Sequence, residues 1–361
     1  MSDQTVLMAD EKDLNREEEK RGVAISWYRT KIDPKLLQAL HKRSDFKALV
    51  QTLGYVGIIT ATAALSLYSF YQWPWYATVA AVFLHGMVCA FMINGVHELC
   101  HNTVFRTQWL NWFFVRLLSF LGWINFRMFE SSHLRHHRYT LHAPDDQEVV
   151  LPTRLGIRHF IGLGFVNWRA PYYHVTETLR IARGRFRGEW ETHLFPVSEP
   201  AKQKLPIRWA RFMLIGHGVI LAVSVYMHWW LVPVLVSLNQ CYGGWLFFLC
   251  NNTQHIGLTD KVPDFRLCCR TIRLDPFTRF LYWQMNYHTE HHMYAAVPCY
   301  NLPRLHQAVK HDLPPTKGLV GAWREIAEIQ ARQDKEPSYQ HVQPCPNPRL
   351  GSRKEPQPAA V

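Results

Sequence analysis

The chain has 361 residues, enough for one large domain or two ordinary ones, and carries a formal net charge of +12. Hydrophobic residues make up 48% of it, yet its mean hydropathy is only −0.16. This combination indicates apolar stretches diluted by a polar, basic remainder. Because the basic residues flank the uncharged stretches, we expect attraction to a lipid bilayer and no recognition of nucleic acid.

Residues 1–47 form a basic N-terminal segment that we expect to be cytosolic. The first 20 residues are strongly charged, so no cleavable signal peptide is expected. The 8 cysteines include no Cys-x-x-Cys pair, which predicts free thiols in a reducing compartment.

Residues 48–95 contain no Lys, Arg, Asp or Glu and predict a hairpin of two transmembrane helices. Ala48–Tyr71 and Tyr76–Gly95 are each about long enough to cross a hydrocarbon core of roughly 30 Å. The turn between them, Gln72–Trp75, contains Pro74 and two tryptophans, as is typical of a membrane interface.

Residues 212–250 repeat this design, with Phe212–Met227 and Leu231–Cys250 as the predicted helices. The fold class is therefore an all-α membrane protein with four transmembrane helices in two hairpins. Because each hairpin returns to the side on which it starts, residues 97–211 and 251–312 form a helical cap on the Lys- and Arg-rich cytosolic face. Within this cap, residues 108–129 predict an interfacial helix.

The domain so defined covers residues 48–312, and residues 313–361 form a C-terminal segment. Its composition becomes rich in Pro, Lys and Arg, which predicts disorder from about residue 334.

Histidines gather where the predicted helices leave the membrane, in patterns that place them on one face of a helix. The first pair is spaced i, i+4, and two triplets are spaced i, i+3, i+4. A further histidine follows the second hairpin, four residues after an asparagine. A catalytic zinc site uses three protein ligands, so this number predicts two metal ions at one site. The cluster residues are His97 and His101, then His133, His136 and His137, then His288, His291 and His292, with Asn251 and His255 at the end of the second hairpin.

These clusters, their order and their positions relative to the hairpins resemble the membrane fatty acid desaturase superfamily of non-haem di-iron enzymes. The resemblance covers residues 45–312 and includes the run Asn286–His292. It implies that two ferrous ions are held by the nine cluster histidines, and that Asn251 approaches an iron through water.

The same resemblance implies an oxidoreductase that uses O₂ as co-substrate to introduce a double bond into an acyl chain or lipid-like substrate. No His-Pro-Gly-Gly haem motif is present, so we expect no fused cytochrome b5 domain. Electrons then come from a separate donor, either a ferredoxin or cytochrome b5 with its reductase.

Four carboxylates adjoin the clusters and could accept the second N–H of an imidazole: Glu98, Asp145, Asp146 and Glu290. The alternative for each is a solvated surface carboxylate. His85 and His217 lie inside apolar stretches, where hydrogen bonding between helices is the favoured interpretation over haem binding.

Other functions compete with the desaturase. Within enzymes these are a hydroxylase, or a desaturase of a small secondary metabolite such as the amino acid dihydrorhizobitoxine. A histidine-rich metal transporter or sensor is the alternative from another class, although transporters place their ligands near the bilayer midplane. The bacterial cytoplasmic membrane and the endoplasmic reticulum membrane are both compatible with the sequence.

Overall fold

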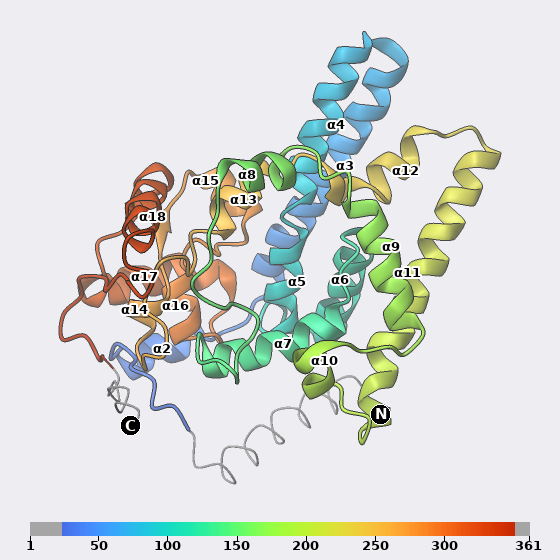
Figure 1. Ribbon diagram of the computed structural model, residues 1–361. Helices are drawn as coiled ribbons and strands as arrows, with labels where there is room; N and C mark the ends of the chain where they lie inside the picture. Colours follow the sequence, from blue (N-terminus) through green and yellow to red (C-terminus); the bar gives the residue numbers. More distant parts are fainter. Residues whose placement is uncertain (1–23, 351–361) are drawn as a thin grey trace.

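The computed structural model describes residues 24–350, which are mostly helical (Figure 1). Two short strands, β1 (Ile272–Arg273) and β2 (Lys317–Gly318), pair in parallel. The predicted helical fold class is confirmed to this extent. The helices are α2 (Pro34–Leu40), α3 (Asp45–Gln72), α4 (Trp75–Cys89), α5 (Met92–Cys100), α6 (Gln108–Leu121), α7 (Phe126–Tyr139), α8 (Ile157–Gly164), α9 (Ala170–Ala182), α10 (Gly188–Leu194), α11 (Pro200–Tyr226), α12 (Leu231–Val236), η1 (Asn239–Cys241), α13 (Trp245–Asn251), α14 (Phe265–Cys268), α15 (Pro276–Leu281), α16 (His288–Met293), η2 (Cys299–Asn301), α17 (Leu302–Val309), η3 (Lys310–Asp312) and α18 (Leu319–Gln333).

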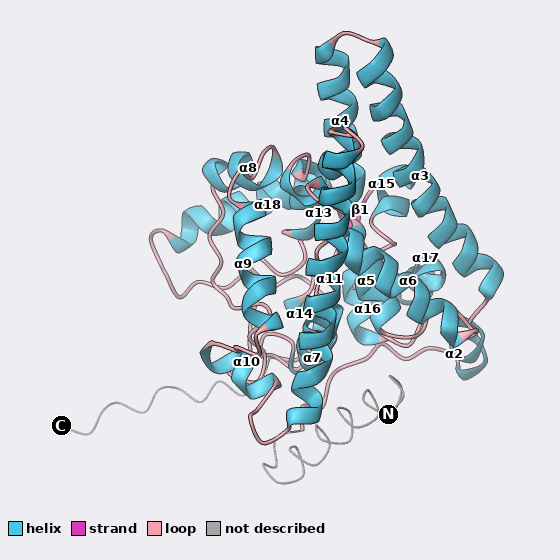
Figure 2. Cartoon of the chain, turned by 90° about the vertical axis from the view of Figure 1, so that its right-hand side faces the viewer, coloured by secondary structure: helices cyan, strands magenta, loops and turns pink. Residues whose placement is uncertain are grey.

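The first predicted hairpin is formed by α3 and α4, whose turn projects beyond the rest of the fold (Figures 1 and 2). Helix α3 begins where the Ser44 hydroxyl accepts a hydrogen bond from the Lys47 amide. It ends before Trp73 and Pro74, both of extended backbone conformation. Helix α5 continues the path of α4 inward, so this arm leads from the hairpin turn to the first histidine pair.

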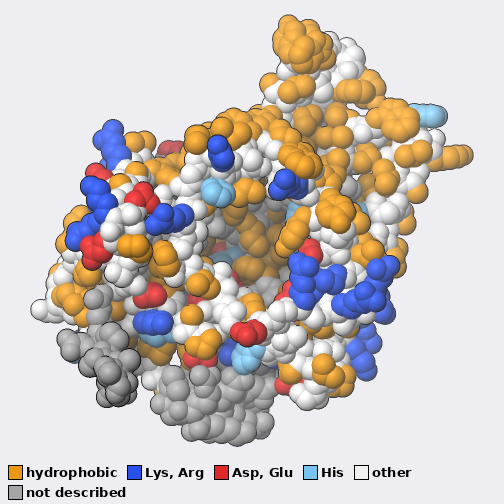
Figure 3. Space-filling view, viewed as in Figure 1, with side chains coloured by type: hydrophobic (Ala, Val, Ile, Leu, Met, Phe, Trp, Pro, Cys, Tyr) orange, Lys and Arg blue, Asp and Glu red, His pale blue; other side chains and the backbone are white. Residues whose placement is uncertain are grey.

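Three helices are long and apolar enough to cross a membrane: Asp45–Gln72, Trp75–Cys100 and Pro200–Tyr226. Their outward apolar side chains are uncovered within the described residues; Ile215 is 67% exposed and Tyr226 is 82% exposed. Figure 3 shows such side chains over the projecting hairpin and along α11, whereas Lys and Arg gather near the opposite end of α11. Such an uncovered apolar surface is that of a membrane protein.

The predicted fourth transmembrane helix, Leu231–Cys250, is not one continuous helix in the described structure. It is divided into α12, η1 and α13, so the count of four spans is not confirmed. Gly243 interrupts it with φ +73°, and a Cβ there would lie 2.5 Å from the Met87 nitrogen and the Phe83 carbonyl oxygen of α4. Helix α4 also supports α12 before the break, because His85 Nε2 donates to the Leu235 carbonyl at 3.0 Å.

The segment 108–129 also differs from the single interfacial helix that was predicted. It contains all of α6 and the first turn of α7, because the chain turns at Gly122–Asn125. Trp123 has φ +53°, and its indole donates to the Ser237 carbonyl at 2.7 Å. The turn is therefore fixed by the broken segment that follows α12.

The C-terminal part of the described chain covers the histidine-bearing helices. Disorder from about residue 334 does not hold for residues 334–350: the Gln343 side chain is buried and donates to the carbonyls of Arg266 and Cys269, both at 2.8 Å. The carbonyls of Arg266 and Cys269 need hydrogen-bond donors, and Gln343 supplies them. These bonds hold a segment for which composition alone predicts no order. Residues 351–361 of the predicted tail, and residues 1–23 of the N-terminal segment, lie outside the described part.

Candidate metal centre

Four segments far apart in the sequence bring all nine cluster histidines together. Helix α5 carries His97 and ends just before His101, α7 carries the second cluster and α16 the third. His255 comes from the turn that follows α13. Figure 1 shows α5, α7 and α16 meeting in the interior of the fold.

The nine rings form two groups, and within each group the potential ligand nitrogens all lie within 4.8 Å of one another. Each helical triplet is divided between the groups, since its i, i+4 pair enters one group and the remaining histidine enters the other. The ring of His137 from the first group stacks on that of His292 from the second at a centroid distance of 4.3 Å. The two groups are therefore adjacent. The first consists of His97, His101, His133, His137 and His291, and the second of His136, His255, His288 and His292.

Within the groups, Nε2 atoms face each other at hydrogen-bond distance. His137 Nε2 lies 2.9 Å from His133 Nε2 and 3.1 Å from His291 Nε2. In the second group, His288 Nε2 lies 2.8 Å from His255 Nε2 and 3.1 Å from His292 Nε2. Two facing lone pairs repel each other, so each contact requires either a proton on one nitrogen or a cation between them. One metal ion in each group, bound by the facing nitrogens, would remove this repulsion at all four contacts.

Burial keeps most of these imidazoles in the neutral form that binds metals. Desolvation lowers the pKa of His133, His137, His291 and His292 well below the ordinary value, and nearby histidines lower it further. The same causes lower the pKa of His255 to about 3. These rings therefore need not lose a proton before they coordinate a cation at neutral pH.

Three carboxylates hold the second ring nitrogen of a cluster histidine, one for each of three rings. His97 Nδ1 donates to Glu98 at 3.1 Å, and His136 Nδ1 donates to Asp146 at 2.9 Å. His133 Nδ1 donates to a carboxylate that the sequence reasoning missed, 2.8 Å away on Glu148. An N–H fixed at Nδ1 leaves the lone pair of Nε2 directed into the centre, which is the arrangement of a metal-binding histidine.

Neutral acceptors fix two further rings. His255 Nδ1 donates to the carbonyl of Cys268 at 2.8 Å. The Thr140 hydroxyl donates to the His136 carbonyl at 2.6 Å, so it accepts from His292 Nδ1 at 3.1 Å. Both rings thus also present Nε2 to the centre.

The four predicted supporting carboxylates do not share one role. Glu98 and Asp146 contact cluster rings, as given above, whereas the buried Glu290 binds Thr271 and the ring of His306 outside the two groups. Asp145 is half-buried in the turn beside Asp146, and Asn251 is the partly buried last residue of α13.

Glu148, Thr140 and the Cys268 carbonyl are the supporting groups that sequence reasoning missed. A signal existed only for Glu148: in the acidic run Asp145–Glu148 it lies two residues after Asp146, a spacing that places both side chains on one side of an extended segment. A threonine and a backbone carbonyl carry no such signal.

The donor set fits metal ions. His97 Nε2 and His101 Nε2 are buried, and among the described residues they have no hydrogen-bond partner. A buried acceptor without a partner costs about 1–3 kcal/mol, and coordination removes that cost. Five nitrogens in one group and four in the other suit one ion each, and imidazole is a ligand for iron, zinc, copper and nickel.

His85 and His217 lie apart from the centre and connect helices. His85 Nδ1 lies 2.9 Å from the Thr62 hydroxyl of α3. His217 Nδ1 lies 2.9 Å from the Ser237 hydroxyl, and its Nε2 donates to the Phe120 carbonyl at 3.0 Å. Each ring is thus occupied by hydrogen bonds between segments, as predicted from the sequence.

A family model described as fatty acid desaturase matches residues 28–322, a range that contains both histidine groups and the three apolar helices. No match was found among the curated proteins.

Proposed function

The chain belongs to the fatty acid desaturase family, and on this premise we propose that it is an O₂-dependent di-iron desaturase that introduces a double bond into an acyl chain or lipid-like substrate. Family membership makes it an oxidoreductase of the membrane. The observation that carries the proposal is the pair of adjacent, buried imidazole groups, because one resident zinc ion needs only three or four such ligands.

In this proposal His97, His101, His133, His137 and His291 hold one iron, and His136, His255, His288 and His292 hold the other. Asn251 would act through a water molecule on one of them. When bound, the two ferrous ions supply the redox chemistry that reduces O₂ and attacks an unactivated C–H bond.

The protein's own part is to orient ligands and to exclude water. Glu98, Asp146 and Glu148 hold three rings in one tautomer and orientation. Formation of each double bond takes two hydrogen atoms from the substrate. Together with two electrons from the donor and two protons from solvent, these two hydrogen atoms reduce one O₂ to two water molecules. Burial of the ligand rings keeps competing water away from this chemistry.

The test is metal analysis and product analysis of the purified, reconstituted protein. We expect two irons per chain, O₂ consumption that depends on an electron donor, and a product lighter than the substrate by two hydrogen atoms. A gain of one oxygen atom would indicate the hydroxylase. Activity on a small amino acid and not on acyl chains would indicate the secondary-metabolite enzyme. One zinc per chain without O₂ use would favour a metal transporter or sensor and contradict the proposal.

We further propose that electrons come from a separate carrier, a ferredoxin or cytochrome b5 with its reductase. A stack of rings supports an entry point: Trp27, half-buried at the surface, stacks on Phe265 at a centroid distance of 4.1 Å. Phe265 in turn lies 5.5 Å from the ring of His292. Exposed Arg29 and Lys31 follow Trp27 in the chain and would attract an acidic carrier.

We also propose that the termini and the metal centre face the cytosol, in a bacterial cytoplasmic membrane or the endoplasmic reticulum membrane. The proposal is supported by the basic residues before each apolar stretch. It is also supported by the position of His97 and His255, which each follow an apolar stretch. Because both belong to one metal centre, the two stretches end on the same side of the membrane. Labelling of single cysteines introduced at Trp75 and Arg29 in sealed vesicles tests it: the two positions should be accessible from opposite sides.

A further inference from the structure

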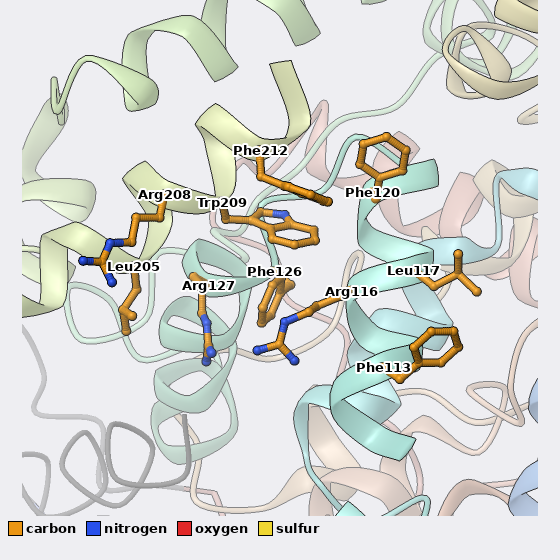
Figure 4. A pocket seen from close by; sticks show the side chains of 10 residues that line it. All are labelled: Phe113, Arg116, Leu117, Phe120, Phe126, Arg127, Leu205, Arg208, Trp209 and Phe212. Atoms are coloured by element: carbon orange, nitrogen blue, oxygen red, sulfur yellow. The ribbon is translucent and has the colours of Figure 1, made fainter. Parts of the chain in front are cut away.

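An open groove with a volume of about 560 Å³ lies between α6, α7 and the first half of α11 (Figure 4). Most of its surface is aromatic or aliphatic, and Phe113 and Phe212 at its sides are about half exposed. The groove belongs to neither histidine group, so the metal centre does not account for it. Its lining residues are Phe113, Arg116, Leu117, Phe120, Phe126, Arg127, Leu205, Arg208, Trp209 and Phe212.

The charged side chains that line the groove in the described part of the chain are all basic. Among residues 24–350, three arginines line it, with no Asp or Glu. Arg127 forms an ion pair with Glu130 at 2.8 Å, and Arg116 donates to the Trp112 carbonyl at 2.9 Å. Arg208 is exposed, and in the described part of the chain no hydrogen bond or ion pair engages its guanidinium. In Figure 4 the three side chains extend from different helices, and those of Arg127 and Arg116 lie on either side of Phe126.

The position of the groove makes it accessible from a bilayer. Arg208 and Arg211 directly precede the uncharged part of α11, which starts at Phe212 and belongs to a candidate membrane span. Basic residues at this position lie at the level of lipid headgroups. The apolar wall formed by Phe120 and Phe212 continues toward the hydrocarbon side, and these two rings are 5.6 Å apart.

We propose that this groove binds one anionic phospholipid of the surrounding bilayer, with its phosphate at Arg116, Arg127 and Arg208 and an acyl chain against Phe120 and Phe212. The volume lies within the range of about 300–1,000 Å³ found for ligand pockets. A phosphate offers acceptor oxygens to several planar guanidinium groups at once, which a single carboxylate does less well. The site does not depend on the reaction at the metal centre.

Binding here joins elements that also support the metal centre. Phe126 and Arg127 form the first turn of α7, and Phe129 of the same helix stacks on His133 at a centroid distance of 4.9 Å. A lipid held between α7 and α11 would therefore stabilise the helix that carries the second histidine cluster. Its effect on stability is measurable without any turnover.

The test uses the full chain in nanodiscs of phosphatidylcholine with increasing amounts of phosphatidylglycerol. We expect a saturable rise of the thermal midpoint and one retained phosphatidylglycerol per chain in native mass spectrometry. Arg208→Gln should raise the half-saturating fraction of phosphatidylglycerol at least about tenfold, as expected for loss of one charged hydrogen bond. The matched control is Lys204→Gln, which removes the same charge from an exposed position of α11 outside the groove.

A second variant, Leu117→Trp, fills the groove without removing a charge and should also abolish the saturable rise. The proposal is overturned if Arg208→Gln and Lys204→Gln respond alike, because the effect is then general surface charge. It is also overturned if oleate competes out the phospholipid at equal concentration, which would make the groove a fatty acid site. Inorganic phosphate alone should produce no rise, and a full rise with it would contradict the acyl part of the assignment.

Discussion

Removal of the Glu148 carboxylate should weaken the first metal site although Glu148 is not itself a ligand. Its Oε1 accepts from His133 Nδ1 at 2.8 Å, and its Oε2 accepts from Ser132 at 2.8 Å. The His133 side chain is 5% exposed, so water cannot easily replace the lost acceptor. Without Glu148 the ring is free to place its proton on Nε2, the atom that faces the metal site.

The magnitude follows from the type of hydrogen bond. A hydrogen bond to a charged group contributes about 1.5–3 kcal/mol, and about 1.4 kcal/mol corresponds to a tenfold change in affinity. Glu148→Ala should therefore lower metal affinity about 10- to 100-fold. In Glu148→Gln an amide oxygen can still accept from His133, so the expected loss is smaller than in Glu148→Ala.

The assay is metal retention per chain after dialysis against a graded series of chelator, with thermal unfolding to verify that each variant is folded. Glu328→Ala is the control, since Glu328 is exposed on α18 and belongs to neither histidine group. Equal retention by Glu148→Ala and the unaltered protein would refute the argument that the Glu148 hydrogen bond orients His133. So would a larger loss in Glu148→Gln than in Glu148→Ala.

Three further outcomes are expected. His255→Ala removes a nitrogen 2.8 Å from His288 Nε2, and metal analysis should show one of the two ions lost; two retained ions would contradict its assignment to the second group. Trp27→Leu should slow turnover with a protein electron donor several-fold but leave reduction by dithionite unchanged. Trp27→Phe should keep most of the rate, because it retains a ring against Phe265. If Trp27→Leu loses the same share of the rate with both reductants, an entry point at Trp27 is excluded. Gly243→Ala should lower the free energy of unfolding by at least about 2 kcal/mol, because alanine is strained at φ +73° and its Cβ would overlap α4. Thermal unfolding in detergent measures this loss, and an unchanged midpoint would show that α4 moves aside without cost.

The sequence alone was sufficient for features that depend on local pattern. Uncharged stretches around a proline-containing turn predicted the α3–α4 hairpin, since both the length of the helices and the break between them follow from nearby residues. The spacing i, i+3, i+4 identified His133, His136 and His137 as one helix face. The same spacing could not show that His136 joins a different group from its two neighbours, because this depends on which helix faces which nitrogen.

Contacts between distant segments decided the rest. Leu231–Cys250 is apolar enough for a membrane helix, but Gly243 packs against the backbone of α4 and divides it. Glu148 reaches His133 because of the path of the loop after α7, and composition does not predict that path. Gln343 is held by backbone carbonyls of another segment. Composition and spacing determine which residues can form a helix or bind a metal. Only the packing of the whole chain determines which hydrogen-bond partners lie close enough to orient those residues.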